Sequence, residues 1–168
     1  MIYKVKAKQH NSKMCFVCGL KNKAGIKAAF FETTGNELIA IFKPCSHHQG
    51  YPSRLHGGIA AAILDETIGR AITIGKEDEV WGVTVELNVK YKKPVPLDEE
   101  IKVISRITSE NKRVFEGEGK IILQNNEVAV TACGKYLKMP IEKIGAFDRQ
   151  LNEWKIVTSK EDPENIKI

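Results

Sequence analysis

The sequence predicts an α+β fold in which a curved antiparallel sheet of about six strands wraps around one long central helix. Residues 57–74 are apolar nearly all round and, at 1.5 Å per residue, suit a buried helix of about 27 Å. Segments with strand-like patterns flank this stretch on both sides and are separated by turn residues. Because no other large apolar element is available to cover a sheet, this helix is expected to form the centre of the domain.

The expected strands occur in the order two strands, the helix, then four strands. Residues 25–32 and 37–44 predict a hairpin before the helix. After it, residues 81–94 alternate, which places Val83, Val85, Leu87, Val89 and Tyr91 on one face and the polar residues, Thr84 among them, on the other. Three further strands are expected at 99–107, 113–123 and 127–139, joined by turn-type connections.

The domain is expected to span residues 1–140, and residues 141–168 are expected to form a C-terminal tail. Four apolar residues of the tail recur at intervals of three and four, namely Ile144, Phe147, Leu151 and Trp154. This spacing predicts a short amphipathic helix that docks on the domain or on a partner subunit, and a helix that binds a membrane or a target peptide is the alternative.

Charge and hydropathy exclude some classes of function. The chain has 26 Lys and Arg against 21 Asp and Glu, a net charge of +5, but bases and acids are interleaved along it. Such interleaving argues against nucleic-acid binding and leaves a polyanionic small molecule as a plausible partner. No apolar run suits a membrane span of roughly 20 residues, and the first residues lack a signal-peptide core, so a cytoplasmic protein without membrane contact is expected.

The four cysteines are Cys15, Cys18, Cys45 and Cys133, and the first two form a C-x-x-C motif. A structural zinc site usually has two close pairs of ligands, and the chain offers only one pair. Reduced, mostly buried thiols without a metal are therefore expected, and zinc or redox chemistry at the C-x-x-C motif is the alternative. By the same argument His47 and His48 are expected to be loop residues.

Two adjacent carboxylates, Asp65 and Glu66, interrupt the apolar helix. At 100° per residue Asp65 shares a stripe of small residues with Gly58, and Glu66 lies about 100° further round, where it is expected to reach water or a basic partner. Buried carboxylates are costly unless satisfied, and they are enriched where protons are transferred or nucleophiles are needed. The structural alternative is an Asp65 satisfied locally by backbone N–H groups or by Arg70.

The start of the same helix offers a second catalytic component. Unpaired N–H groups at Gly57 and Gly58, together with the positive end of the helix dipole, suit a developing oxyanion. Gly58 and Asp65 lie about 10.5 Å apart along the helix axis, too far to act on one carbonyl group from one helix. The two residues can share a reaction if two chains place their helices side by side and antiparallel, which predicts a two-fold dimer with shared sites.

These segments resemble the hotdog-fold acyl-CoA thioesterases of the PaaI-like group. The matching stretches are HGGIAAAILDE at 56–66, CFVCGLKNKAGIK at 15–27 and TVELNVKYKKPVP at 84–96, and the resemblance covers roughly residues 15–139. It implies a hotdog fold, dimers that often pair into tetramers, and hydrolysis of a thioester between an acyl group and coenzyme A. Coenzyme A is then part of the substrate, and no separate cofactor is expected.

The resemblance also implies roles for individual residues. Asp65 would act as general base or nucleophile, the Gly58 amide would contribute to the oxyanion hole, Thr84 would position the attacking water, and Gln49 would lie near the thioester. His56 either fixes the helix entry near the thioester or simply caps a loop.

The expected substrate contacts are Gly57, Glu66, Lys92 and Lys93. The two lysines belong either to a solvated strand edge or to a site for the phosphates of coenzyme A. A hydratase or dehydratase and an acyl-CoA-binding sensor without turnover are the competing functions.

Overall fold

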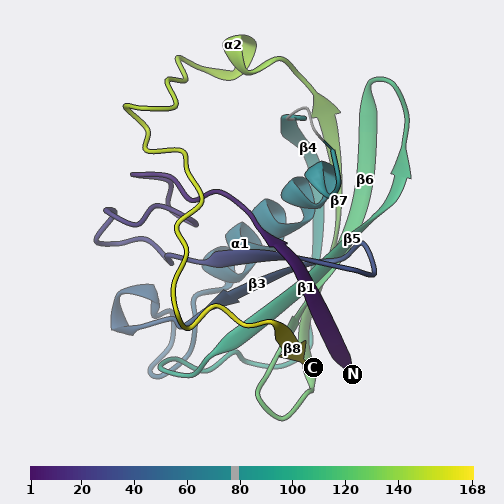
Figure 1. Ribbon diagram of the computed structural model, residues 1–168. Coiled ribbons are helices and arrows are strands. Elements are labelled where there is room, and N and C mark those ends of the chain that lie inside the picture. Colours follow the sequence, from purple (N-terminus) through teal and green to yellow (C-terminus); the bar gives the residue numbers. More distant parts are fainter. Residues whose placement is uncertain (77–79) are drawn as a thin grey trace.

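The computed structural model describes residues 1–76 and 80–168, and it folds as one antiparallel sheet curved around the helix α1 (Gly57–Arg70), as Figure 1 shows. The order of strands in the sheet is β4-β7-β6-β5-β3-β2-β1-β8. The strands are β1 (Ile2–Lys8), β2 (Ala29–Thr33), β3 (Leu38–Phe42), β4 (Gly82–Tyr91), β5 (Ile101–Glu110), β6 (Val114–Ile122), β7 (Val128–Lys138) and β8 (Asn165–Lys167). The predicted α+β class, with one central helix inside a curved sheet, is confirmed.

The helix packs on the sheet through its apolar side, where Ile63, Leu64 and Ile68 are fully buried. Gly117 in β6 allows the closest approach, because a Cβ atom there would lie 2.7 Å from Ile68 Cγ2. After Arg70 the chain tightens into a single 3-10 turn, η2 (Ala71–Thr73). The predicted helix at 57–74 is thus present, with its last turn in 3-10 form.

Two strands were not expected from the sequence, since β1 and β8 come from the polar ends of the chain. They pair with each other at the edge of the sheet, with Tyr3 opposite Ile166. Ile166 is buried in a second, smaller core with Phe31, Ile39, Ile104 and Ile122. The sheet therefore has eight strands in the described residues, and the N- and C-termini of the chain lie next to each other in Figure 1.

A β-bulge in β4 changes the faces that simple alternation predicts for this strand. The pairing with β7 shifts between Thr84 and Glu86, so that Val85 is an extra residue. Thr84 therefore faces α1 together with Leu87, whereas Val85 is 62% exposed. The expectation that Val85 and Leu87 share a face and that Thr84 lies opposite them is wrong.

The C-terminal tail contains one helical turn, α2 (Ile141–Ile144), and no longer amphipathic helix in its described residues. The expectation that Phe147, Leu151 and Trp154 continue such a helix is wrong, and Leu151 is 75% exposed. Trp154 instead stacks on His10 with ring centroids 5.3 Å apart. The tail therefore docks on its own domain, running down one side of the molecule towards β8 (Figure 1).

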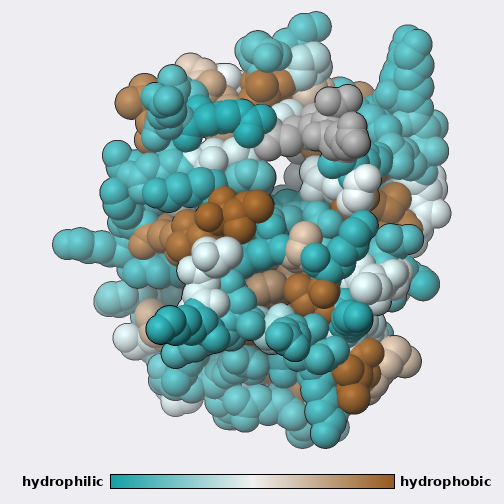
Figure 2. All heavy atoms as spheres, in the orientation of Figure 1, coloured by the Kyte–Doolittle hydropathy of each residue, from teal (hydrophilic) through white to brown (hydrophobic). Residues whose placement is uncertain are grey.

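The surface carries separated apolar patches among hydrophilic residues on the face drawn in Figure 2. Exposed acids and bases pair repeatedly, for example Lys76 with Glu110 at 2.6 Å and Arg106 with Glu118 at 2.7 Å. Among the described residues, no helix has both the length and the apolar character needed to cross a bilayer.

Replacing Ile68 by Ala is expected to lower the free energy of unfolding by about 2–5 kcal/mol, because it opens a cavity where α1 meets β6. Urea unfolding of the wild type and the variant measures this loss. Leu151→Ala is the matched control and should leave the midpoint nearly unchanged, since Leu151 is 75% exposed. Equal midpoints for Ile68→Ala and the wild type would contradict the packing described here.

Candidate active site

The Asp65 carboxylate lies between α1 and the adjacent strands β4 and β7. Its Oδ1 atom accepts hydrogen bonds from Thr84 Oγ1 and from the Tyr136 hydroxyl, both at 3.0 Å. Its Oδ2 atom lies 3.1 Å from Thr84 Oγ1. Side-chain hydroxyls, and neither Arg70 nor the backbone, therefore hold this carboxylate in the described residues.

Burial sets the protonation behaviour of Asp65. Desolvation raises its pKa, the hydrogen bonds from Thr84 and Tyr136 lower it, and the charge of Glu66 raises it, with the net result above the ordinary value. A carboxylate whose pKa lies closer to neutrality is a stronger base than an exposed Asp. The site therefore has an oriented proton acceptor.

Tyr136 is a site residue that the sequence reasoning missed. Its ring is buried in β7 and stacks on Phe115 with centroids 4.9 Å apart. Its single hydroxyl hydrogen is shared between Asp65 Oδ1 and the Asp65 carbonyl oxygen, each 3.0 Å from the hydroxyl oxygen. Burial and the charge of Asp65 raise the pKa of Tyr136, so its hydroxyl remains a donor at neutral pH. The available signal was the alternation in 127–139, which places Tyr136 on the face of Ala132 and Gly134.

The start of α1 is capped by His56. Its Nδ1 atom accepts a hydrogen bond from the Gly58 N–H at 2.9 Å. The amide that was expected to be an unpaired oxyanion donor therefore has a partner in this structure. The Gly57 N–H, at the first helical position, has no acceptor within the helix. Tyr91 donates to the Gly57 carbonyl oxygen at 2.8 Å, which ties β4 to this end of the helix.

The single chain does not bring all the expected site residues together. Asp65 and Thr84 are in direct contact, whereas Gly58 lies two turns of the helix away from Asp65. Gln49 lies in the loop before the helix, where its Oε1 atom accepts a hydrogen bond from the Ser53 N–H at 3.1 Å. Its backbone pairs with that of Leu55, so the loop is closed on itself beside His56.

The remaining expected contacts lie on different sides of the helix. Glu66 faces away from Thr84 and forms an ion pair with Arg70 at 2.8 Å, so the expectation of a basic partner is confirmed. Lys92 and Lys93 are exposed beyond the end of β4, and Lys93 forms an ion pair with Glu127. Tyr91 contacts Gly57 at the start of α1, and Lys92 and Lys93 are the next two residues of the chain, so they lie near the N-terminus of the helix.

The cysteines differ in their surroundings. Cys18 is buried, Cys15 and Cys45 are partly buried, and Cys133 is exposed, so the expectation of mostly buried thiols is wrong for Cys133. Donor atoms of Cys15, Cys18 and Glu66 lie within 4.8 Å of one another.

His48 lies apart from the three donor residues. Its Nδ1 atom accepts from the Cys45 N–H, and its other ring nitrogen contacts the Ala24 carbonyl oxygen at 3.2 Å. Both ring nitrogens of this buried side chain therefore have partners, one next to the short 3-10 turn Ser46–His48 and the other at Ala24 in a separate loop.

Comparisons with known proteins support the class of fold. Residues 53–130, which contain α1 and β4, match the family model described as thioesterase superfamily. A crystal structure of a thioesterase superfamily protein matches with a TM-score of 0.67 at 24% identity, over 73% of this chain and 59% of that one. The E. coli PaaI protein, from the phenylacetic acid degradation operon, matches with a TM-score of 0.61 at 10% identity, over 68% of this chain and 81% of that one.

One relative has a named enzymatic activity. The chain is 28% identical to acyl-coenzyme A thioesterase THEM4 of Mus musculus over 117 residues, which are 69% of this chain and 49% of the relative. The chain thus spans about half the length of this relative. The resemblance to the hotdog-fold thioesterases of the PaaI-like group is confirmed.

Asp65→Asn is expected to make the protein more stable than the wild type at neutral pH. Because the folded pKa of Asp65 is raised, the wild type loses stability relative to this variant as pH rises from the unfolded pKa to the folded one, and the loss persists above it. Below the unfolded pKa the difference disappears. Urea unfolding from pH 3 to pH 8 measures it.

Asp162→Asn is a control for which the opposite dependence of stability on pH is expected. Burial raises the pKa of Asp162, but the hydrogen bond and charge of Lys8, with the Ser159 N–H, lower it overall. The wild type should therefore gain stability over this variant as pH rises through the depressed pKa of Asp162 and the unfolded value. If the stability of the wild type relative to both variants changes in the same direction as pH rises, the burial argument for Asp65 is refuted.

Proposed function

We propose that the protein hydrolyses an acyl-CoA thioester to a free acid and coenzyme A. The observation that carries this proposal is the partly buried Asp65 carboxylate, held by the Thr84 and Tyr136 hydroxyls on the face of α1 that borders β4. The acyl-CoA thioesterase activity named for the relative THEM4 supports the same substrate class.

In the proposed reaction Asp65 either takes a proton from water or attacks the thioester carbonyl directly. Its Oδ1 atom already accepts two hydrogen bonds, whereas Oδ2 has the single contact with Thr84. We therefore assign Oδ2 as the reacting oxygen. Thr84 also orients the attacking water, and the coenzyme A thiolate leaves when the tetrahedral intermediate collapses.

The proposed oxyanion hole lies at the start of α1. The thioester oxygen replaces His56 Nδ1 as the acceptor of the Gly58 N–H, and the Gly57 N–H is the second donor. His56 is then a gate that satisfies the Gly58 amide until substrate arrives. Gln49 lies in the adjoining loop and contributes its amide group to the thioester pocket.

The proposed site is shared between two chains. Strand β4 is the edge of the sheet, and its Val85 and Tyr91 side chains are 62% and 55% exposed. Pairing of two chains through this edge, with their helices antiparallel, would set Gly58 of one beside Asp65 of its partner. We propose such a dimer, which can pair further into a tetramer.

The phosphates of coenzyme A are proposed to bind near the helix N-terminus, through Lys92 and Lys93. Lys93 contributes less to phosphate binding because Glu127 already pairs with it.

We also propose a cytoplasmic location for the protein, as expected from the sequence.

Asp65→Asn is expected to lower the rate of thiol release from acyl-CoA by about a hundredfold to ten-thousandfold, because it removes the base or nucleophile. A thiol reagent measures the rate on a panel of aliphatic and aromatic acyl-CoAs. Asp98→Asn is the matched control, since Asp98 is exposed and has a φ of 61°, which Asn tolerates well.

The outcomes separate the competing functions. Full activity of Asp65→Asn would refute the assignment of Asp65. Tight binding of acyl-CoA without thiol release in the wild type would indicate a sensor, and formation of a hydrated acyl-CoA from an enoyl-CoA would indicate a hydratase.

Val85→Lys is expected to dissociate the proposed dimer and to reduce thiol release, because it places like charges along the paired β4 edges. Sedimentation velocity measures the mass, and far-UV circular dichroism checks the fold. Leu151→Lys, a change at another exposed apolar residue, should leave the mass unchanged. A fully active monomer would overturn the shared site.

A further inference from the structure

The C-x-x-C motif forms one tight turn against the outer side of α1. The Gly19 N–H donates to the Cys15 carbonyl oxygen at 2.8 Å, which closes the turn around both cysteines. A Cβ atom on Gly19 would lie 2.3 Å from that oxygen, so only glycine fits. The turn thus holds Cys15 Sγ and Cys18 Sγ within 4.8 Å of each other.

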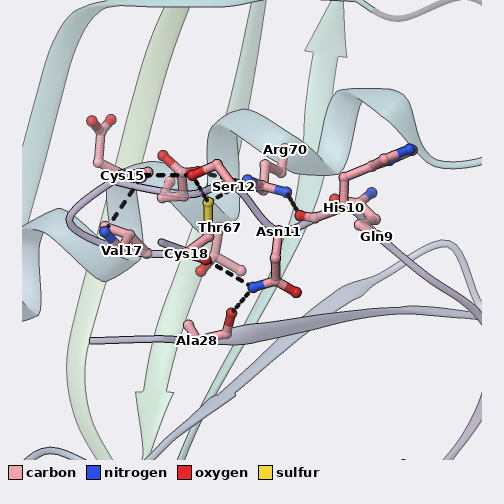
Figure 3. A network of polar contacts seen from close by, with 12 residues as sticks. Gln9, His10, Asn11, Ser12, Cys15, Val17, Cys18, Ala28, Thr67 and Arg70 are labelled. Atoms are coloured by element: carbon pink, nitrogen blue, oxygen red, sulfur yellow. Dashed lines mark hydrogen bonds and ion pairs between the residues drawn. The ribbon is translucent and has the colours of Figure 1, made fainter. Parts of the chain in front are cut away.

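Arg70 fixes the electrostatics of this turn (Figure 3). Its three guanidinium nitrogens donate to three acceptors: Glu66 at 2.8 Å, the His10 carbonyl oxygen at 2.8 Å, and Cys18 Sγ at 3.1 Å. The guanidinium carbon also lies 4.4 Å from the centroid of the Phe30 ring. A buried cation with every nitrogen engaged is a fixed positive charge beside Cys18.

The surroundings of the two cysteines favour the thiolate form of Cys18 and the protonated thiol form of Cys15. The hydrogen bond from Cys15, the charge of Arg70 and the hydrogen bond from Ser12 lower the pKa of Cys18, against burial and the charge of Glu66, which raise it. The pKa of Cys15 is raised, first by its hydrogen bond to Cys18 and then by burial. Such a thiol and thiolate pair in a C-x-x-C turn is the arrangement used in thiol–disulfide exchange.

A zinc ion fits this cluster less well. Zinc in a structural site takes four ligands, and Cys15, Cys18 and Glu66 provide three donors in the described residues. Arg70 already occupies the carboxylate of Glu66 and the sulfur of Cys18. A metal ion would have to displace or oppose this buried cation.

We propose that Cys15 and Cys18 are a redox-active dithiol, which a low-molecular-weight disulfide oxidises to an intramolecular disulfide. The partly exposed Cys15 meets the small disulfide first, because Cys18 is only 1% exposed. Cys15 Sγ attacks one sulfur of the small disulfide while its proton passes to the Cys18 thiolate, and one thiolate leaves.

In the second step Cys18 Sγ attacks Cys15 Sγ and releases the other thiolate, and the proton passes to one of the two leaving groups. In sum, one thiol, one thiolate and the small disulfide give the protein disulfide, one small thiol and one small thiolate. The two protein sulfurs lose two electrons, and the small disulfide gains them.

The test uses the reduced full chain in glutathione buffers of increasing disulfide content, quenched with N-ethylmaleimide and measured by intact mass and peptide mapping. Of the four free cysteines, two should be lost, with the cross-link between Cys15 and Cys18. A Cys45→Ser, Cys133→Ser double variant should lose the same two thiols, and Cys15→Ser should form no cross-link.

Two further variants test the role of the charges. Arg70→Gln removes the stabilisation of the thiolate, so the midpoint of oxidation should shift to more reducing buffers. Glu66→Gln removes an opposing charge and should shift the midpoint to more oxidising buffers. Glu66→Gln keeps the test decisive if Arg70→Gln does not fold.

Several results would overturn the proposal. They are four intact thiols at every buffer ratio, adducts confined to Cys45 and Cys133, or stoichiometric zinc bound by the Cys15 and Cys18 thiols of the reduced protein. Because thiols and cross-links are counted, the outcome does not depend on acyl-CoA turnover.

Discussion

A carboxylate within an otherwise apolar helix is the constraint on which the rest of the site depends. Removing the Asp65 carboxylate from bulk water costs free energy unless neighbours satisfy it. Two hydroxyls do so, one from β4 and one from β7, which pair with each other in the sheet. The helix, the edge strand and its neighbour are thereby held in one relative position, and the same contacts leave one carboxylate oxygen available for chemistry.

The hydroxyl from β4 reaches Asp65 only because the strand is irregular. Without the bulge at Val85, Thr84 and Leu87 would lie on opposite faces of β4, and burying Leu87 would turn Thr84 to the outer side. The bulge therefore lets β4 make two contacts with the same helix, a polar one through Thr84 and an apolar one through Leu87.

The helix and Asp65 could be predicted because both follow from local pattern. An apolar run with a carboxylate on its small-residue stripe is visible in the sequence, and burial of that carboxylate follows from the period of the helix. Thr84 was identified through the family resemblance, but alternation gave it the wrong face, since a single extra residue leaves no mark in composition.

Tyr136 and the terminal strands were missed for a different reason. Tyr136 lies 71 residues from Asp65 in sequence, and its contact depends on the register of β4 with β7. β8 has three residues with one apolar side chain, Ile166, and its pairing with β1 depends on Ile166 reaching a small outer core that only the folded sheet creates. Long-range register of this kind is set by tertiary packing and is not encoded in local propensity.

The adjacent acids Asp65 and Glu66 show how one helix separates two kinds of chemistry. Asp65 lies among neutral hydroxyls, so desolvation dominates and its pKa rises. Glu66, about 100° further round, meets the fixed cation Arg70, and through Arg70 it is coupled to Cys18. One helix thus presents a proton acceptor to one side and a charge-stabilised thiol turn to the other. The two neighbours occupy different electrostatic environments, and the charge of Glu66 is the last of the contributions to the pKa of Asp65.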